Sequence, residues 1–172
     1  MASEVLALMD SLHVPKAALV GWSDGGIIGL DIAINHPERL TKLFAFGANA
    51  DDSGTKDDMD KHPAFRAYWD RTTEEYQRLS PTPSEYNAFM EQLEKMWASE
   101  PRISDEQLRR IKVPTWIVEG DRSEVIKREH TDQLAAVISR CSELILPNVS
   151  HFALLQDPEQ FTEALLHFLS RP

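Results

Sequence analysis

A serine lies between two glycines in the segment Gly21-Trp22-Ser23-Asp24-Gly25, which has the pattern G-x-S-x-G. In a sharp turn from a strand to a helix, this pattern lifts the serine hydroxyl off the backbone so that it can attack a carbonyl carbon. We expect both glycines to be needed, because a Cβ at either flank would collide with the neighbouring strand or helix. The backbone N–H of Asp24 is a candidate donor to the oxyanion that forms. The segment therefore predicts acyl transfer through Ser23.

Two phosphate-binding patterns compete for the same glycines. Gly21 and Gly26 have the spacing of a Walker A loop, but Ile27 stands where that loop needs a lysine. Ser23 also interrupts any G-x-G-x-x-G pattern. Nucleotide binding is therefore disfavoured, and a tight turn without a catalytic role is the remaining alternative for residues 21–26.

A serine hydroxyl needs a base within hydrogen-bond reach, and the chain has six histidines. Five of them stand at or near the ends of predicted elements, and we interpret them as surface or capping residues: His13, His36, His62, His130 and His167. His151 differs, because residues 147–152 form the loop directly after the last predicted strand. The carboxyl end of that strand is the sheet edge where Ser23 also emerges. We expect His151 to be the general base.

A carboxylate is expected to orient the histidine and to stabilise its charged form. Asp121 and Glu124 are the acidic residues that come just past a strand at this edge and precede His151. Asp121 lies closer to the end of the strand, whereas Glu124 has the longer reach, so both alternatives stay open. The order serine, acid, histidine is that of the hydrolases built on an α/β sheet and not that of chymotrypsin or subtilisin.

Short apolar runs predict four buried strands, at residues 17–20, 43–47, 116–119 and 143–146. Helical patterns occur before the first strand, at residues 24–35, around Leu134 and after Asp157, which has the features of an N-cap. Alternation of strands and helices with short connections predicts an α/β fold, with a parallel sheet covered by helices on both faces.

Residues 51–109 contain no predicted strand and read as a helical cap, or lid, inserted into a core of residues 1–50 and 110–172. Aromatic stripes in this segment predict amphipathic helices that pack against the sheet, and as a lid they would line an apolar acyl pocket. Five aspartates between residues 51 and 60 lack the spacing of an EF-hand. We interpret them as a solvated loop and expect no metal.

These residues together resemble the α/β-hydrolase fold superfamily. The resemblance rests on the G-x-S-x-G segment, on His36-Pro37-Glu38-Arg39, on the strand ending at Gly120, and on Ser150-His151-Phe152 with Asp157-Pro158-Glu159 behind it. It covers residues 1–50 and 110–172, while residues 51–110 correspond in position to the family's variable cap. The resemblance implies a hydrolase with Ser23 as nucleophile, His151 as base and no cofactor.

The chain departs from the family pattern in two places. Ser123 stands where the family usually has its acid, so Asp121 or Glu124 must substitute or the triad is a dyad. Only about four core strands are present, and the strands that normally precede the serine, with the loop that supplies a second oxyanion N–H, are missing. Strand 17–20 then becomes a sheet edge, and an uncovered apolar edge recruits another chain. We therefore expect a homo-oligomer formed through this strand or its neighbouring surface.

The composition of the chain limits the classes of partner and function that it can have. The net charge of −10 disfavours nucleic acid and anionic membranes as partners. A single cysteine, Cys141, and the absence of a long apolar run favour a soluble cytoplasmic chain. The leading hypothesis is a serine hydrolase of the carboxylesterase type that acts on a small ester; hydrolysis of a carbon–carbon bond and perhydrolysis remain open. The alternative is a catalytically impaired α/β-hydrolase-like module that serves in binding or assembly.

Overall fold

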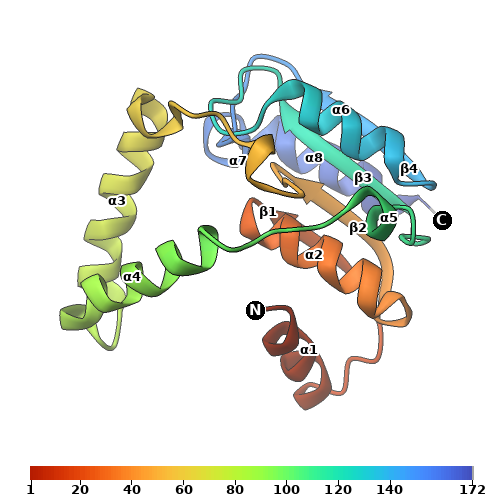
Figure 1. The fold of residues 1–172 in the computed structure, drawn as a ribbon, viewed down its shortest axis with the longest axis horizontal. Helices are drawn as coiled ribbons and strands as arrows, with labels where there is room; N and C mark the ends of the chain where they lie inside the picture. The colour runs from red at the N-terminus through yellow and green to blue at the C-terminus, as the bar shows by residue number, and fades with distance from the viewer. Residues whose placement is uncertain (172) are drawn as a thin grey trace.

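The computed structural model describes residues 1–171, and its centre is a parallel sheet with the strand order β1-β2-β3-β4 (Figure 1). All three strand pairs are parallel. The strands are β1 (Ala17–Trp22), β2 (Leu40–Phe46), β3 (Thr115–Gly120) and β4 (Cys141–Leu146). The four predicted strands are therefore confirmed, and β1 extends two residues beyond its predicted end, so that Gly21 and Trp22 belong to the strand.

Eight α-helices occur within residues 1–171, and several begin at the predicted residues. They are α1 (Ala2–Ser11), α2 (Asp24–Asn35), α3 (Pro63–Leu79), α4 (Tyr86–Trp97), α5 (Asp105–Leu108), α6 (Arg128–Val137), α7 (Ala153–Gln156) and α8 (Pro158–Ser170). Four short 3-10 helices connect them, at Pro37–Arg39, Asp52–Gly54, Met59–Lys61 and Pro83–Glu85. The Asp157 side chain accepts a hydrogen bond from the N–H of Gln160, which confirms the predicted N-cap of α8.

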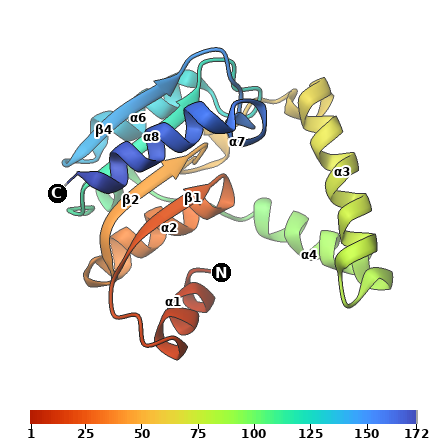
Figure 2. The same ribbon diagram turned by 180° about the vertical axis from the view of Figure 1, so that it is seen from behind.

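Helices cover both faces of the sheet, as Figures 1 and 2 show. Alternate residues of β2 point to opposite faces: Leu43 and Ala45 pack with α2, α5 and α6, whereas Phe44 and Phe46 pack with α7 and α8. Each face thus has its own apolar core, and β2 and β3 are buried between them. This sandwich fixes the carboxyl ends of the strands, where the loops that carry the candidate site begin.

β1 is an edge strand, because it pairs with β2 and with no other strand among residues 1–171. Its outward side is incompletely covered, and Val20 remains 42% exposed. The prediction that strand 17–20 forms an edge is therefore confirmed.

The helices α3 and α4 extend beyond the sheet on the side of its carboxyl ends (Figures 1 and 2). None of their residues is fully buried, although aromatic side chains follow each other at helical spacing. Phe65 and Tyr68 of α3 contact Phe152, and Tyr68 also contacts Trp22, so these stripes meet the end of the sheet rather than one of its faces. This differs from the expected packing. Within residues 1–171, no helix combines the length and apolar character that crossing a membrane requires.

Candidate active site

Ser23 forms the turn between β1 and α2 and has a left-handed backbone conformation, with φ of 55°. This conformation costs a side-chain-bearing residue about 1–3 kcal/mol and persists only where the surroundings enforce it. The Ser23 N–H donates a hydrogen bond of 2.8 Å to the carbonyl of Phe46, and the Ser23 carbonyl accepts one of 2.8 Å from Gly26. The main chain is therefore held in place, while the hydroxyl makes no hydrogen bond to any residue from 1 to 171.

The two glycines of the motif play different parts. A Cβ on Gly21 would lie 2.1 Å from the carbonyl oxygen of Gly25, so the close approach of strand and helix requires glycine there. A Cβ on Gly25 would meet nothing within 4 Å. The expectation that both flanks need glycine is therefore wrong for Gly25, because this position lies in the first turn of α2 and its Cβ would point away from the strand.

His151 lies in the loop between β4 and α7, where it is 3% exposed. Its imidazole ring packs on Gly47, the residue after β2, whose φ is 67° and whose added Cβ would lie 2.5 Å from the ring. The Ser23 N–H donates a hydrogen bond to the carbonyl of Phe46, the residue before Gly47. The serine and the histidine therefore meet at the same end of β2. The structure thus brings Ser23 and His151 to one sheet edge, as predicted from the order of the strands.

No hydrogen bond joins Ser23 to the imidazole among residues 1–171. Catalytic hydrogen bonds are often long before substrate binds and tighten in the complex. The indole of Trp22 holds the loop instead: its Nε1 donates a hydrogen bond of 2.8 Å to the backbone carbonyl of His151. The residue before the serine therefore sets the position of the histidine.

The two carboxylates named from the sequence occupy different environments. Asp121 is exposed, and its side chain makes no hydrogen bond or ion pair to residues 1–171. Glu124 is 5% exposed and accepts hydrogen bonds from the Ser150 hydroxyl at 3.3 Å and from the N–H of His151 at 3.4 Å. Glu124 therefore contacts the main chain of the histidine, and neither carboxylate lies against the imidazole nitrogens.

A third carboxylate, which the sequence reasoning missed, is the nearest acid to the imidazole. Glu119 lies in β3, is 1% exposed, and places Oε2 at 3.7 Å from Nδ1 of His151. Its other oxygen, Oε1, accepts a hydrogen bond of 2.8 Å from the N–H of Gly120. The available signal was a charged residue within an apolar strand, since glutamate is rarely buried unless it has a partner.

Ser123 occupies the position at which the family resemblance leads one to expect the acid. Its hydroxyl accepts hydrogen bonds from the N–H groups of Val125 and Ile126, at 3.4 and 3.1 Å. Its carbonyl accepts a hydrogen bond of 2.6 Å from Lys56. Ser123 thus stabilises the turn after β3 and contributes no charge near His151.

The N-terminus of α2 supplies the candidate oxyanion donor. The N–H groups of Asp24 and Gly25 have no acceptor among residues 1–171, as is usual in the first turn of a helix. They lie beside the serine and carry the partial positive charge of the helix dipole. The Asp24 carboxylate accepts a hydrogen bond of 3.0 Å from the indole of Trp97 in α4.

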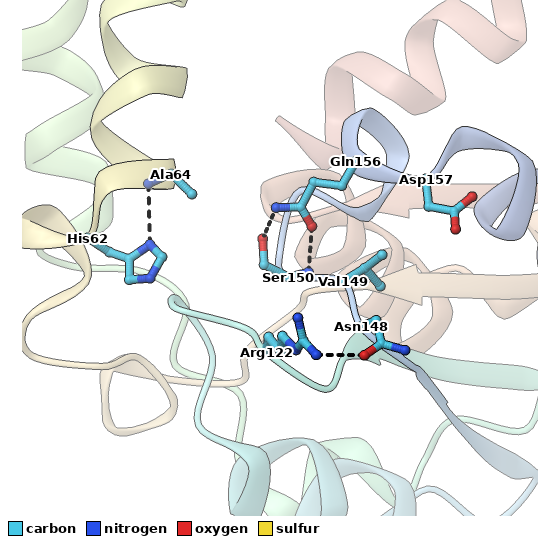
Figure 3. A pocket seen from close by; sticks show the side chains of 8 residues that line it. All are labelled: His62, Ala64, Arg122, Asn148, Val149, Ser150, Gln156 and Asp157. Carbon is cyan, nitrogen blue, oxygen red and sulfur yellow. Dashed lines mark hydrogen bonds between the residues drawn. The ribbon is translucent and has the colours of Figure 1, made fainter.

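An open pocket of about 480 Å³ lies between the start of α3 and the loop that carries His151 (Figure 3). Its lining includes His62 and Ala64 at the start of α3, and Arg122 and Ser150 in the loops after β3 and β4. An adjoining hollow of about 350 Å³ shares His62 and Arg122 and reaches Glu124. Neither space is lined by Ser23 or His151, so these hollows flank the candidate site and do not contain it.

The remaining histidines are exposed, as expected, with one exception. His13, His36, His62 and His167 lie at the surface, and His62 caps α3 by accepting a hydrogen bond from Ala64. His130 was expected at the surface too, but it is 4% exposed, which corrects that interpretation. Its Nε2 accepts a hydrogen bond of 2.9 Å from the N–H of Ala50, and burial lowers the pKa of this imidazole.

The aspartates between residues 51 and 60 form a loop that is mostly exposed. In the part of the chain that the structure describes, no three His, Cys, Asp or Glu side chains come close enough together to hold a metal ion. The residues at the end of β2 and around Ser23 bring together a hydroxyl, an imidazole and buried carboxylates.

This fold is that of α/β hydrolases: the model of the alpha/beta hydrolase family matches residues 2–164, and the chain belongs to that family. Among curated proteins it is similar to the serine hydrolase BPHL of mouse, with 26% identity over 177 residues, and of human, with 28% over 180. Each of these alignments covers 98% of the chain. The chain spans about 60% of the length of these relatives.

A second relative is the 2-hydroxy-6-oxo-6-(2'-aminophenyl)hexa-2,4-dienoic acid hydrolase of Metapseudomonas resinovorans. It is 26% identical over 184 residues, which are 91% of this chain and 60% of the relative. Among solved structures, a meta-cleavage product hydrolase from Pseudomonas fluorescens IP01 superposes with a TM-score of 0.74 and 22% identity, over 98% of this chain and 70% of that one. The superposition shows that the two share a fold.

Proposed function

We propose that the chain is a serine hydrolase that cleaves a small carboxylic ester by acyl transfer through Ser23 and His151. The observation that carries the proposal is the placement of both residues at one end of β2, with Ser23 held to Phe46 and the His151 ring packed on Gly47. The names of the BPHL relatives, which are serine hydrolases, support the same class of reaction.

In this mechanism the Ser23 oxygen attacks the carbonyl carbon of the ester while its proton passes to Nε2 of His151. The N–H of Asp24 donates to the oxyanion of the tetrahedral intermediate. His151 then returns the proton to the departing alcohol, which leaves an acyl group on Ser23. A water molecule, deprotonated by the same imidazole, then attacks the acyl carbon; the bond to the Ser23 oxygen breaks, that oxygen takes the proton back from His151, and the carboxylic acid leaves. These steps need only a hydroxyl, a base and hydrogen-bond donors, so we propose a reaction without a cofactor.

The proposal also covers the cellular location of the chain and its self-association. Cys141 is the one cysteine of the chain, so no disulfide can form within it, which supports a cytoplasmic location.

We also propose that a second copy pairs with the free edge of β1. The support is that this strand has one partner within residues 1–171, and that residues 17–22 carry no charge that would repel a copy of the same strand.

Labelling with a fluorophosphonate tests the proposal, because this probe reacts with serine nucleophiles that have an adjacent base. We expect labelling of the wild-type chain, loss of labelling in Ser23→Ala, and unchanged labelling in Ser99→Ala, an exposed serine just past the end of α4. Hydrolysis of p-nitrophenyl esters of increasing chain length then measures the size of the acyl group. A folded wild-type chain that is neither labelled nor active on any ester would contradict the proposal.

A second candidate function is that of a binding or assembly module with impaired catalysis. Two observations within residues 1–171 favour it: no hydrogen bond joins Ser23 to His151, and the candidate oxyanion donors are the N–H groups of Asp24 and Gly25, both in α2. Removal of one oxyanion donor typically lowers the rate by roughly 10²–10³-fold. The same labelling experiment separates the two functions, since a module of this kind folds but does not react with the probe at Ser23.

A further inference from the structure

Glu119 is a buried carboxylate in the interior of the sheet, in the strand β3. Its neighbours in sequence, Val118 and Gly120, are also buried, and its side chain is 2% exposed. Oε1 accepts the Gly120 N–H, but Oε2 is buried and has no hydrogen-bond partner among residues 1–171. Burial of an ionised carboxylate costs several kcal/mol unless it is paired, so this free oxygen calls for a partner.

The imidazole of His151 also has a buried nitrogen without a hydrogen-bond partner among residues 1–171. This nitrogen, Nδ1, lies 3.7 Å from Oε2 of Glu119. A charge-assisted hydrogen bond between nitrogen and oxygen is ~2.8 Å long, so the two atoms need to approach by about 0.9 Å to form one. Each atom thus lacks one partner, and the other atom is close enough to become it after a small movement.

We propose that Glu119 is the positioning residue of the catalytic histidine, an inference that rests on the proposed function. Its Oε2 accepts a hydrogen bond from Nδ1–H of His151, which leaves the lone pair on Nε2 for the proton of Ser23. As that proton moves from the serine oxygen to Nε2, Nδ1 keeps its own proton, and the carboxylate stabilises the imidazolium that results.

The other two carboxylates do not compete for this task. Asp121 is exposed and does not approach the ring, and Glu124 uses both oxygens on the loop, one on the Ser150 hydroxyl and one on the N–H of His151. The two buried glutamates therefore divide the work: Glu119 faces the imidazole nitrogen, and Glu124 holds the backbone beneath it. The acid that Ser123 does not supply thus comes from within the strand, four residues earlier in the chain.

The substitution Glu119→Gln tests the assignment. An amide that turns its oxygen toward Nδ1 places its NH₂ group against the Gly120 N–H, and the opposite orientation forces the histidine proton onto Nε2. We expect kcat on a p-nitrophenyl ester to fall roughly 10²–10⁴-fold with little change in KM. Asp121→Asn and Glu124→Gln lower kcat much less than Glu119→Gln does, and the exposed control Glu94→Gln has no effect.

A nuclear magnetic resonance readout separates positioning from a structural role. In ¹⁵N-labelled wild-type protein we expect the neutral His151 ring to carry its proton on Nδ1, and in Glu119→Gln on Nε2. A wild-type ring protonated on Nε2 overturns the proposal without any variant, so the test holds even where Glu119→Gln does not fold.

The kinetic outcomes also distinguish this inference from the proposed function. Wild-type chain that fluorophosphonate does not label at Ser23 refutes the proposed function. Wild-type chain that is labelled, together with a folded Glu119→Gln that reacts at the same rate, refutes the role of Glu119 alone. A large loss of kcat in Asp121→Asn or Glu124→Gln, with Glu119→Gln unaffected, assigns the role to that other residue instead.

Discussion

The indole of Trp22 and the backbone of His151 are joined by a hydrogen bond of 2.8 Å, which links the strand before the candidate nucleophile to the loop of the candidate base. The centroids of the Trp22 indole and the His151 imidazole also lie 5.7 Å apart. The turn between β1 and α2 is therefore held to the loop of His151 by Trp22, the residue before the serine.

We expect Trp22→Phe to lower kcat about tenfold, because the loop loses its fixed position and a small misplacement of a base is costly. The free energy of unfolding should fall by about 1 kcal/mol, the usual contribution of one hydrogen bond. Ester hydrolysis and urea unfolding measure the two effects. Trp116→Phe is the matched control, since its indole N–H makes no hydrogen bond to residues 1–171. Equal kcat in Trp22→Phe and wild type would show that this bond does not position the base.

The two glycines of the motif should respond in opposite ways to the same substitution. Gly21→Ala introduces a Cβ 2.1 Å from the carbonyl oxygen of Gly25, so we expect a loss of stability of more than about 3 kcal/mol or a chain that does not fold. Gly25→Ala meets open space within a helix and should be neutral or stabilising by up to about 1 kcal/mol. Thermal unfolding of the two variants measures the difference, and comparable midpoints would contradict the packing seen between β1 and α2.

Stability should depend on pH through His130. Burial lowers the pKa of this imidazole below its ordinary value of 6.5, so the folded chain favours the neutral form that accepts the Ala50 N–H. The stabilisation is complete above the unfolded pKa and is lost as the pH falls through the lower, folded pKa. We therefore expect the free energy of unfolding to decrease between about pH 7 and pH 5.

The variant His130→Gln isolates this effect, because its amide oxygen can replace Nε2 as the acceptor but does not titrate in this range. We expect a flatter dependence of urea unfolding on pH in His130→Gln than in wild type. His36→Gln, which changes an exposed histidine, serves as the control and should keep the slope of the wild type. An unchanged slope in His130→Gln would assign the pH dependence to other groups.

The sequence was sufficient to predict the elements but not the contacts within the site. Strands buried on both faces appear as apolar runs, and a G-x-S-x-G segment between a strand and a helix is typical of a turn that exposes a nucleophilic serine. Strand order then brought Ser23 and His151 to one edge. These features depend on local patterns and on the general geometry of parallel sheets, which is why they could be predicted.

Glu119 and His130 escaped prediction for a common reason. Glu119 ends an apolar run and His130 stands in the first turn of a helix, and in both places a polar residue is usually solvated. Their burial depends on residues far along the chain: His151 lies beside the glutamate, and the loop at Ala50 covers the histidine. The prediction for Gly25 was wrong because it assumed a collision where there is open space. The direction of a Cβ at this position depends on the helix and not on the motif.

The edge strand β1 is the proposed interface between two copies of the chain. If a second copy pairs with this strand, Ala18→Lys should convert the assembly to a monomer, because a charged side chain on an edge strand opposes strand pairing. Sedimentation velocity at micromolar concentration measures the change, and we expect a dimer or larger species in the wild type. Ala67→Lys adds the same charge at an exposed position on α3 and should leave the assembly intact. A monomeric wild type, or an assembly that survives Ala18→Lys, would show that β1 is not the interface.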